Sequence, residues 1–122
     1  MNVSILKLKD ILVVSIQSEL SDSDIEKLNS AVLSKISDTG PKYLIVDVSP
    51  LEIMDTFIAR SIIKLTKAAK YMGAHSVITG LSVEIILTLL RMGFNWGNIE
   101  TALNLEHGVD KCWKRHADQQ MK

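Results

Sequence analysis

The sequence predicts an α/β fold with one mixed, mostly parallel β-sheet, an antiparallel hairpin at the N-terminal edge, and about four helices. Short apolar runs with a period of two alternate with longer segments whose apolar residues recur every three or four positions. Two strand-like runs come first and helix then alternates with strand, an order that favours an antiparallel edge and a parallel centre. The 122 residues match the usual size of one domain, so we expect residues 1–122 to form a single domain.

The first two runs predict the hairpin. Apolar residues alternate with polar ones in both of them: Leu6 and Leu8, then Leu12, Val14 and Ile16. Lys9 and Asp10 lie between the runs as a short turn. The alternation predicts that one face of the hairpin is buried and the other is in water.

The next segment predicts a helix that ends at Gly40-Pro41. Ser21 to Asp24 supply an N-cap, with Ser23 and Glu26 as a capping box and Leu20 as a hydrophobic staple. Apolar residues then follow at helical spacing: Ile25, Leu28, Val32 and Ile36.

A buried strand and a second helix follow. Tyr43 to Val46 form a short apolar run typical of a strand covered on both faces, and Asp47 stands at its carboxyl end. The helix begins near Asp55-Thr56 and is closed by Gly73. Its predicted core stripe consists of Ile58, Ile62, Leu65, Ala69 and Met72.

The remaining elements repeat this alternation. Ser76 to Thr79 predict a buried strand, Gly80 a turn, and Ser82 the cap of a third helix that ends at Gly93. That helix is apolar nearly all round, so either the core is deep there or a partner covers it; its apolar residues are Val83, Ile85, Ile86, Leu87, Leu89 and Leu90. A last strand near Ile99 to Leu103 precedes a helix with one shared face of Val109, Cys112, Trp113 and His116.

Composition and motifs argue against several classes of function. Fourteen Lys plus Arg balance fourteen Asp plus Glu, without the concentrated basic tract that nucleic-acid binding needs. One cysteine and three scattered histidines offer no metal ligand set, and no Gly-rich nucleotide loop suggests a cofactor. No apolar run reaches the roughly 18 to 20 residues that span a membrane, so we expect a cytoplasmic protein.

Candidate catalytic groups do not form a constellation. His75, His107 and His116 are widely spaced, and Cys112 on an apolar helix face is typical of a core thiol. Asp47 at a strand end resembles the phosphorylated aspartate of response-regulator receivers, but their acidic pair is missing. We therefore assign Asp47 to capping or loop hydrogen bonds and expect a protein that is not an enzyme.

Asp55-Thr56-Phe57 is the most informative motif. Asp55 or Thr56 is expected to cap the second helix. A hydroxyl at a helix N-terminus is also a place where the helix dipole and free amides tolerate a phosphate. A phosphoryl group would add about −1.5 to −2 charges beside Asp55, which is enough to make or break a docking surface.

A basic stripe follows on the same helix, formed by Arg60, Lys64, Lys67 and Lys70. Two interpretations stay open. The stripe is either a solvated face or, together with the flanking apolar residues Phe57 and Ile63, part of a protein-docking surface.

The order and spacing of six segments resemble the STAS domains of bacterial anti-sigma factor antagonists, and among them the small stressosome scaffolds of the RsbS type. The resemblance covers nearly the whole chain. It rests on the segments Ile5 to Leu8, Leu12 to Gln17, Ile53 to Arg60, Met72 to Ala74, Val77 to Gly80, and Glu100 to Glu106.

The resemblance implies a non-enzymatic scaffold and switch. Such proteins assemble with RsbR-type STAS paralogues, as homo-dimers and in larger stressosome particles, and hold an RsbT-type serine/threonine kinase until that kinase phosphorylates them. The family's acceptor position is Thr56 here, where most close relatives carry serine, and the docking residues would be Asp55, Phe57, Ile58 and Arg60. The kinase would supply ATP and magnesium, so no cofactor, nucleic acid or membrane is expected. The resemblance also implies an alternative, a module that binds a small nucleotide or lipid ligand.

Overall fold

The computed structural model describes residues 3–16 and 20–121, so Gln17, the last residue of one segment above, lies outside the described residues. The chain alternates strands and helices as the sequence predicted. The elements are β1 (Val3–Leu8), β2 (Ile11–Ile16), α1 (Asp22–Thr39), β3 (Tyr43–Asp47), α2 (Thr56–Tyr71), β4 (His75–Thr79), α3 (Val83–Arg91), β5 (Glu100–Ala102) and α4 (Leu105–Gln120).

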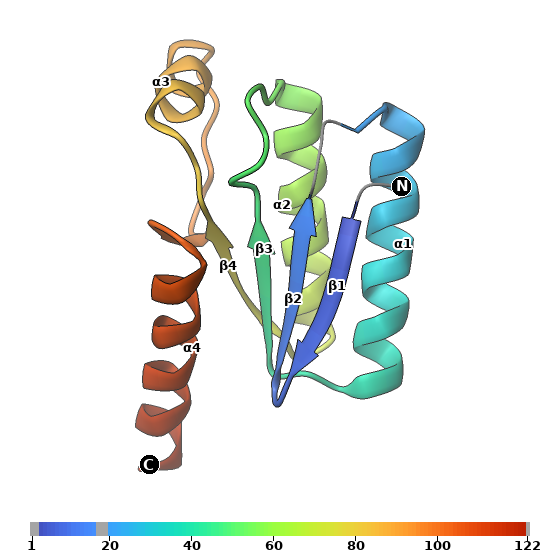
Figure 1. Ribbon diagram of the computed structural model, residues 1–122, viewed down its shortest axis with the longest axis vertical. Helices are drawn as coiled ribbons and strands as arrows, with labels where there is room; N and C mark the ends of the chain where they lie inside the picture. Colours follow the sequence, from blue (N-terminus) through green and yellow to red (C-terminus); the bar gives the residue numbers. More distant parts are fainter. Residues whose placement is uncertain (1–2, 17–19, 122) are drawn as a thin grey trace.

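The sheet confirms the predicted α/β class. Its strand order is β1-β2-β3-β4-β5, with β1 antiparallel to β2 and every later pair parallel. Helices α1 and α2 lie on one face, α4 lies on the other, and α3 lies beyond the end at which the parallel strands finish (Figure 1). The carboxyl ends of the parallel strands therefore open toward α3 and the start of α2, which is where α/β sheets commonly place ligand and partner sites.

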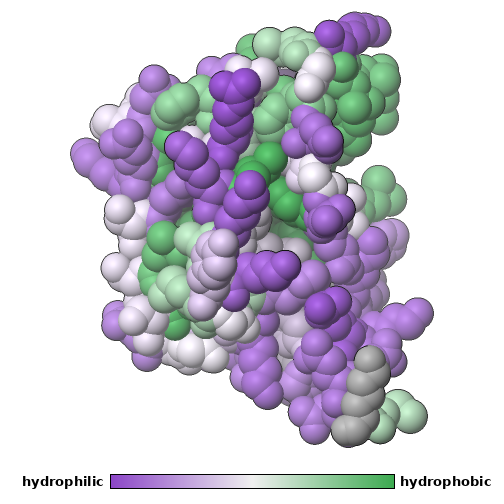
Figure 2. All heavy atoms as spheres, turned by 180° about the vertical axis from the view of Figure 1, so that it is seen from behind, coloured by the Kyte–Doolittle hydropathy of each residue, from purple (hydrophilic) through white to green (hydrophobic). Residues whose placement is uncertain are grey.

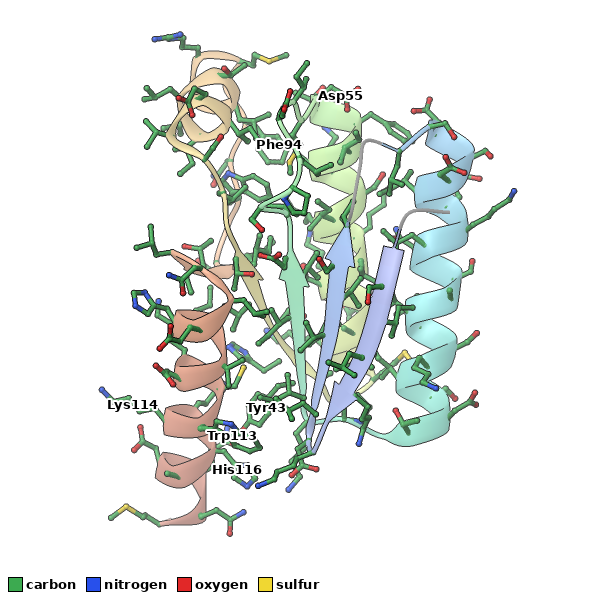
Figure 3. The ribbon with its side chains drawn as sticks, viewed as in Figure 1. Tyr43, Asp55, Phe94, Trp113, Lys114 and His116 are labelled. Atoms are coloured by element: carbon green, nitrogen blue, oxygen red, sulfur yellow. The ribbon has the colours of Figure 1, made fainter. Side chains whose placement is uncertain are left out.

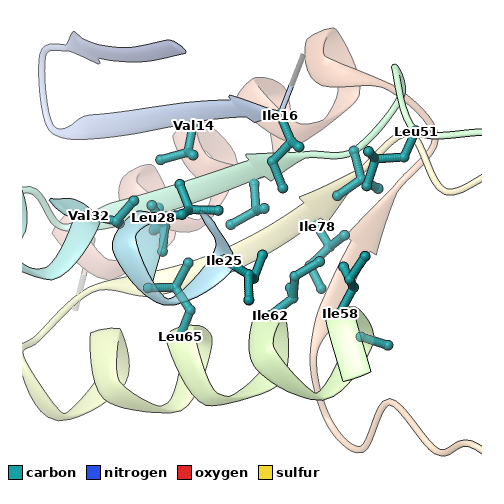
Figure 4. Packing of buried hydrophobic residues seen from close by; sticks show 14 of the residues in the cluster. Val14, Ile16, Ile25, Leu28, Val32, Leu51, Ile58, Ile62, Leu65 and Ile78 are labelled. Carbon is teal, nitrogen blue, oxygen red and sulfur yellow. The ribbon is translucent and has the colours of Figure 1, made fainter. Parts of the chain in front are cut away.

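Two apolar clusters hold the layers together. The larger one joins the sheet to α1 and α2, and the predicted α1 residues Ile25, Leu28, Val32 and Ile36 are all buried in it (Figure 4). The smaller one joins the sheet to α4 and contains Ile11, Val13, Tyr43, Ile45, Val77 and Cys112. Val109 and Trp113 pack against this second cluster, which confirms the predicted inner face of α4.

The hairpin forms as predicted, but its burial differs from the prediction. Lys9 turns the chain with φ 53°, and Leu8 pairs with Ile11. β2 is covered on both faces, because its side chains pack in the larger cluster on one face and in the smaller cluster on the other, so the expected wet face is wrong for this strand. On β1, Leu6 and Leu8 are 61% and 42% exposed, since α4 packs chiefly on β3, β4 and β5, away from this edge strand.

Helix α1 corrects the predicted capping box. Ser21 is the N-cap and Asp24 is its partner, with each side chain accepting a hydrogen bond from the other residue's backbone amide. The expected pair of Ser23 and Glu26 is therefore wrong by two residues. Leu20 is buried in the same cluster as Ile25, as a staple requires, and Gly40 ends the helix at φ 59°.

Helix α2 confirms four of the five predicted core residues. Ile58, Ile62, Leu65 and Ala69 are buried, whereas Met72 is 42% exposed. Met72 is the C-cap residue, and its backbone has already left helical geometry. The helical period therefore no longer places its side chain toward the core.

Helix α3 is apolar nearly all round, and the structure excludes a deep core as the explanation. Only Ile85 and Leu89 are buried, so the core of the chain does not absorb the other apolar side chains. Hydrophobic side chains gather at that end of the molecule in Figure 2. After the helix, Phe94 packs against the larger cluster and ties α3 to the body of the fold (Figure 3).

The last strand is shorter than predicted, since β5 has three residues. Of the helices that the structure describes, none combines the length and the apolar character needed to cross a membrane.

Candidate functional site

The segment between β3 and α2 is built around Asp47. Its Oδ1 accepts a hydrogen bond from Thr79 Oγ1 at 2.8 Å, and its Oδ2 accepts one from Ser49 Oγ, also at 2.8 Å. The residue is buried. Both carboxylate oxygens are thus used to join the ends of β3 and β4 to the loop, which confirms the assignment of Asp47 to loop hydrogen bonds.

Gly80 allows the loop to lie this close to β4. It has φ +80°, and a Cβ atom on it would lie 2.6 Å from Ser49 Cβ and 2.9 Å from Ser49 Cα. Only glycine fits both conditions, because L-residues with a side chain rarely adopt this backbone conformation. The hydrogen bond from Val48 N to Thr79 O, at 2.9 Å, fixes the same contact.

Two buried side chains anchor the loop between β3 and α2. Leu51 and Met54 are each 4% exposed and belong to the larger cluster, whereas Ile53 between them is 67% exposed. This alternation anchors the loop at both sides of an outward-facing residue. The position of the start of α2 is therefore fixed relative to the sheet.

Asp55 is the residue that caps α2. Its Oδ1 accepts a hydrogen bond from Ile58 N at 2.8 Å, and its backbone oxygen accepts one from Ala59 N at 3.1 Å. Asp55 lies at the exposed end of the helix (Figure 3). Of the two candidates for the cap, the structure selects Asp55 and leaves Thr56 as the first helical residue.

Thr56 stands at the positive end of the helix dipole. Its side chain is half-buried, and within the described part of the chain its hydroxyl has no hydrogen-bond partner. The amides of Thr56 and Phe57 have no acceptor inside the helix, as at any helix start. A hydroxyl placed in this way is free to react and has donors nearby for an anion.

The other predicted docking residues divide between surface and core. Phe57 is 41% exposed, and Arg60 lies exposed one turn along the helix from Thr56. Ile58, by contrast, is 8% exposed and points into the larger cluster (Figure 4). Ile58 therefore supports the helix start from below and offers a partner almost no surface.

The basic stripe of α2 is exposed along its whole length, at Arg60, Lys64, Lys67 and Lys70. The two hydroxyls inside the helix have structural roles. Ser61 Oγ donates to Phe57 O at 2.9 Å, and Thr66 Oγ1 donates to Ile63 O at 2.8 Å. Thr56 thus differs from Ser61 and Thr66, because its hydroxyl donates no hydrogen bond to the described backbone of the helix.

His75, His116 and Cys112 lie away from this site. His75 Nε2 lies 3.0 Å from Glu100 Oε2, and His116 Nδ1 lies 3.2 Å from Tyr43 Oη (Figure 3). Cys112 is fully buried, and burial raises the pKa of its thiol to about 11. Across residues 3–16 and 20–121, no three His, Cys, Asp or Glu side chains are grouped so as to hold a metal ion.

Sequence reasoning missed Ser49 as a partner of Asp47 and the backbone contact between Ser49 and Gly80. Neither has a periodic signal, because both depend on where β3 and β4 end beside each other. The hydroxyl residue two positions after Asp47 was the only available hint, since Ser near Asp is typical of side-chain turns.

Comparison with known proteins identifies the family to which this architecture belongs. The family model described as the STAS domain matches residues 2–107. A structure of Moorella thermoacetica RsbS, in a variant with one serine-to-glutamate replacement, is 33% identical with a TM-score of 0.83, covering 96% of this chain and 99% of that one. A chain in a structure of the stressosome, described as a signal integration and transduction hub, is 30% identical with a TM-score of 0.76, covering 93% and 98%.

Among curated sequences, the RsbT co-antagonist protein RsbRD of Bacillus subtilis (strain 168) is 32% identical over 75 residues, which is 62% of this chain and 27% of that protein. The chain spans 25% to 34% of the three co-antagonist relatives that it matches. The similarity to these longer proteins therefore concerns only about a quarter to a third of their length.

Proposed function

Because the chain belongs to the STAS domain family, we propose that it is a stressosome scaffold that holds a serine/threonine kinase and releases it when Thr56 is phosphorylated. Its similarity to RsbS over nearly the whole chain and to the STAS part of RsbR-type co-antagonists supports this role. In this role residues 1–122 act as one STAS domain, a substrate and scaffold rather than an enzyme, in the cytoplasm where the kinase has ATP.

The observation that carries the proposal is the free hydroxyl of Thr56 at the start of α2. It is half-buried rather than fully buried, it lies beside the exposed side chains of Phe57 and Arg60, and the loop before it is anchored to the sheet through Asp47 and Leu51. A kinase that docks on this end of the molecule meets an acceptor at a fixed position. Such fixed positioning is most of what phosphoryl transfer requires.

The chemistry belongs to the kinase and the acceptor belongs to this chain. Thr56 Oγ1 attacks the γ-phosphorus of ATP, the bond between that phosphorus and the bridging oxygen breaks, ADP leaves, and the hydroxyl proton passes to a base of the kinase. The product places about −1.5 to −2 charges next to the Asp55 carboxylate. The amides of the first turn offset part of this repulsion within the chain, but a docked kinase would have to desolvate both anions. We expect the modified chain to release it for that reason.

Threonine at this position changes the acceptor without removing it. Its extra methyl group restricts the side chain to fewer rotamers than serine has. A kinase adapted to threonine would find the hydroxyl already oriented, whereas a kinase adapted to serine would react more slowly. The comparison of the two residues is therefore part of the test.

The partners in this proposal follow the names of the relatives. We propose an RsbT-type kinase as the partner at the start of α2, and RsbR-type STAS paralogues and further copies of this chain as partners in the particle. The proteins similar to this one are described as RsbT co-antagonists and as a stressosome component.

The test is to incubate the chain with ATP and an RsbT-type serine/threonine kinase and to map phosphopeptides by mass spectrometry. We expect one phosphate on Thr56, none in Thr56→Ala, and an unchanged yield in Ser34→Ala, a control hydroxyl on the exposed side of α1. Thr56→Ser reports whether the kinase prefers serine. Phosphorylation elsewhere with Thr56 unmodified would overturn the proposal.

A second candidate function is supported by a groove of about 540 Å³ between α2, the loop before β5 and α4. Lys67, Lys70 and Arg115 line it together with the apolar side chains of Ile63 and Trp96. The carboxylate of Glu100 also lines the groove, 3.0 Å from His75. Three cationic side chains against one carboxylate suit an anionic ligand with an apolar part. A thermal-shift screen with ATP, GTP and mixed lipids tests it. Stabilisation that is lost in Arg115→Ala would favour the ligand-binding module, and the absence of any shift would exclude it.

A further inference from the structure

Helix α3 leaves a stripe of apolar side chains in water. Val83 is 66% exposed, Leu87 44% and Leu90 58%. These residues follow the i, i+4, i+7 spacing and so form one line along the helix, opposite the buried pair of Ile85 and Leu89. We call Val83, Leu87 and Leu90 the α3 stripe. A stripe of this kind on a stable helix is typical of an interaction surface.

The apolar surface continues beyond the helix. Ile86 and Leu103 line one groove between α3 and α4, and Leu103 is 74% exposed. Met92, at the end of α3, is 58% exposed. Figure 2 shows hydrophobic side chains gathered at the α3 end of the molecule.

Two charges indicate which partner covers the stripe. Glu84 and Arg91 are both exposed and lie seven residues apart on the same flank of the α3 stripe, about 10.5 Å along the axis. At that separation they cannot pair with each other in one helix. Within the residues that the structure describes, neither has a hydrogen-bond or ion-pair partner.

A second copy of the same helix, running in the opposite direction, satisfies both charges at once. When two helices pack antiparallel across a two-fold axis, each flank faces the same flank of the partner. Glu84 of one copy then faces Arg91 of the other, and the reciprocal pair forms by symmetry. Leu87 lies at the centre of this arrangement, because it is midway between the two charges. A parallel arrangement would bring opposite flanks together and would leave both charges unpaired.

We propose that α3 is a self-association surface at which two copies of this chain pack antiparallel through the α3 stripe, with two reciprocal pairs between Glu84 and Arg91. The inference deepens the assembly part of the proposed function by naming the contact, and it does not depend on the kinase or on Thr56. A single pair of short helices buries less than a standard interface, so the isolated contact is weak. Repetition of the contact in a larger particle strengthens it by avidity.

The test is sedimentation equilibrium of the chain alone at about 0.1 to 1 mM, where a small interface of this kind is populated. We expect reversible dimerisation of the unaltered chain. Leu87→Ser should abolish it, while Tyr71→Ser, a control at a residue that is 93% exposed on α2, should leave it unchanged. Thermal unfolding of each variant checks that the fold is retained.

Charge reversal distinguishes the antiparallel arrangement of the two helices from nonspecific hydrophobic association. Glu84→Arg and Arg91→Glu each place like charges opposite each other twice, so each variant alone should dimerise about tenfold more weakly. An equimolar mixture of the two variants restores both attractive pairs, as does the double variant carrying both changes. Both should recover the dimerisation of the unaltered chain.

A strictly monomeric chain, or charge variants that associate as the unaltered chain does, would overturn the proposal. The proposal would also be overturned if the unaltered chain associated through the α3 stripe with a STAS paralogue but not with a second copy of itself. The kinase is absent from the experiment, so its outcome is independent of Thr56 phosphorylation. Glu84→Arg should remain a kinase substrate at Thr56, which distinguishes a failure of this contact from a failure of the switch.

Discussion

Gly80 shows how one residue sets the distance between the loop that carries the candidate site and the sheet. Its backbone is left-handed, and the backbone and Cβ of Ser49 occupy the space that a side chain would need. The left-handed backbone and the contact with Ser49 both disfavour a Cβ atom at position 80. The hydrogen bonds of Asp47 to Ser49 and Thr79 depend on this spacing, so the residue couples the ends of β3 and β4.

Gly80→Ala should therefore destabilise the chain more than the left-handed backbone alone explains. Alanine in this conformation costs about 1 to 2 kcal/mol, and forced contact with Ser49 adds about 1 to 3 kcal/mol. The matched control is Gly93→Ala, where φ is +75° but nothing in the described part of the chain lies within 4 Å of the new Cβ. Urea unfolding of both variants measures the difference. Equal losses would show that the loop moves away from Ser49 without cost.

At the scale of the element, period and capping chemistry made most of the fold predictable. The stripe from Ile25 to Ile36 has a clear helical period, the segment from Tyr43 to Val46 is a continuous apolar run, and Asp55 and Ser82 are good N-cap residues; the structure confirms all of them. Two of the failures concern burial, which depends on what surrounds a residue as well as on the local period. β2 is covered on both faces because of where it lies in the sheet, and Met72 is exposed because the helix ends just before it.

The candidate site was predictable to the same extent. The sequence located Thr56 and Asp55 at a helix start because capping is local chemistry. The helical period also placed Ile58 in the core stripe and Phe57 on its flank, and the structure buries the first and exposes the second. The partnership of Asp47 with Thr79 links residues 32 positions apart, and no local pattern encodes it.

The start of α2 should depend on its cap. Replacing Asp55 with alanine removes the acceptor of the Ile58 amide and should lower the free energy of unfolding by about 1 kcal/mol. Asp55→Asn keeps an acceptor oxygen at the same place and should recover most of that loss. The measurement is urea unfolding at neutral pH. An alanine variant as stable as the unaltered chain would mean that water replaces the carboxylate at no cost.

The two substitutions also separate capping from charge. Asp55→Asn removes the negative charge next to Thr56 while keeping the helix start, so the phosphorylated variant would carry less repulsion at this end. If release of the kinase depends on both anions, phosphorylated Asp55→Asn should retain more of the kinase than the phosphorylated unaltered chain. Equal retention would assign release to the phosphate alone.

At the scale of the whole molecule, the proposed kinase contact and the proposed self-contact share one end of the sheet without sharing a helix. The carboxyl ends of β3 and β4 lead into the start of α2 and into α3 (Figure 1). Thr56 and Arg60 belong to the first surface, whereas the α3 stripe belongs to the second. A scaffold that holds a kinase while packed in a particle needs two such separate surfaces.

The two interpretations of the basic stripe on α2 predict different effects of charge reversal along the helix. Arg60 is four residues from Thr56 and therefore on the same side of the helix, but Lys70 lies about 21 Å further along the axis than Thr56. If only the start of α2 contacts the kinase, Arg60→Glu should weaken kinase binding at least about tenfold, since it reverses a charge in the contact. Lys70→Glu makes the same change of charge outside the contact and should leave the affinity within about twofold at physiological salt, where the Debye length is near 8 Å.

Titration of the kinase with each variant by isothermal calorimetry gives both affinities. Equal weakening by the two substitutions would mean that the whole stripe steers the kinase through long-range electrostatics, and no effect from either would leave the stripe as a solvated face.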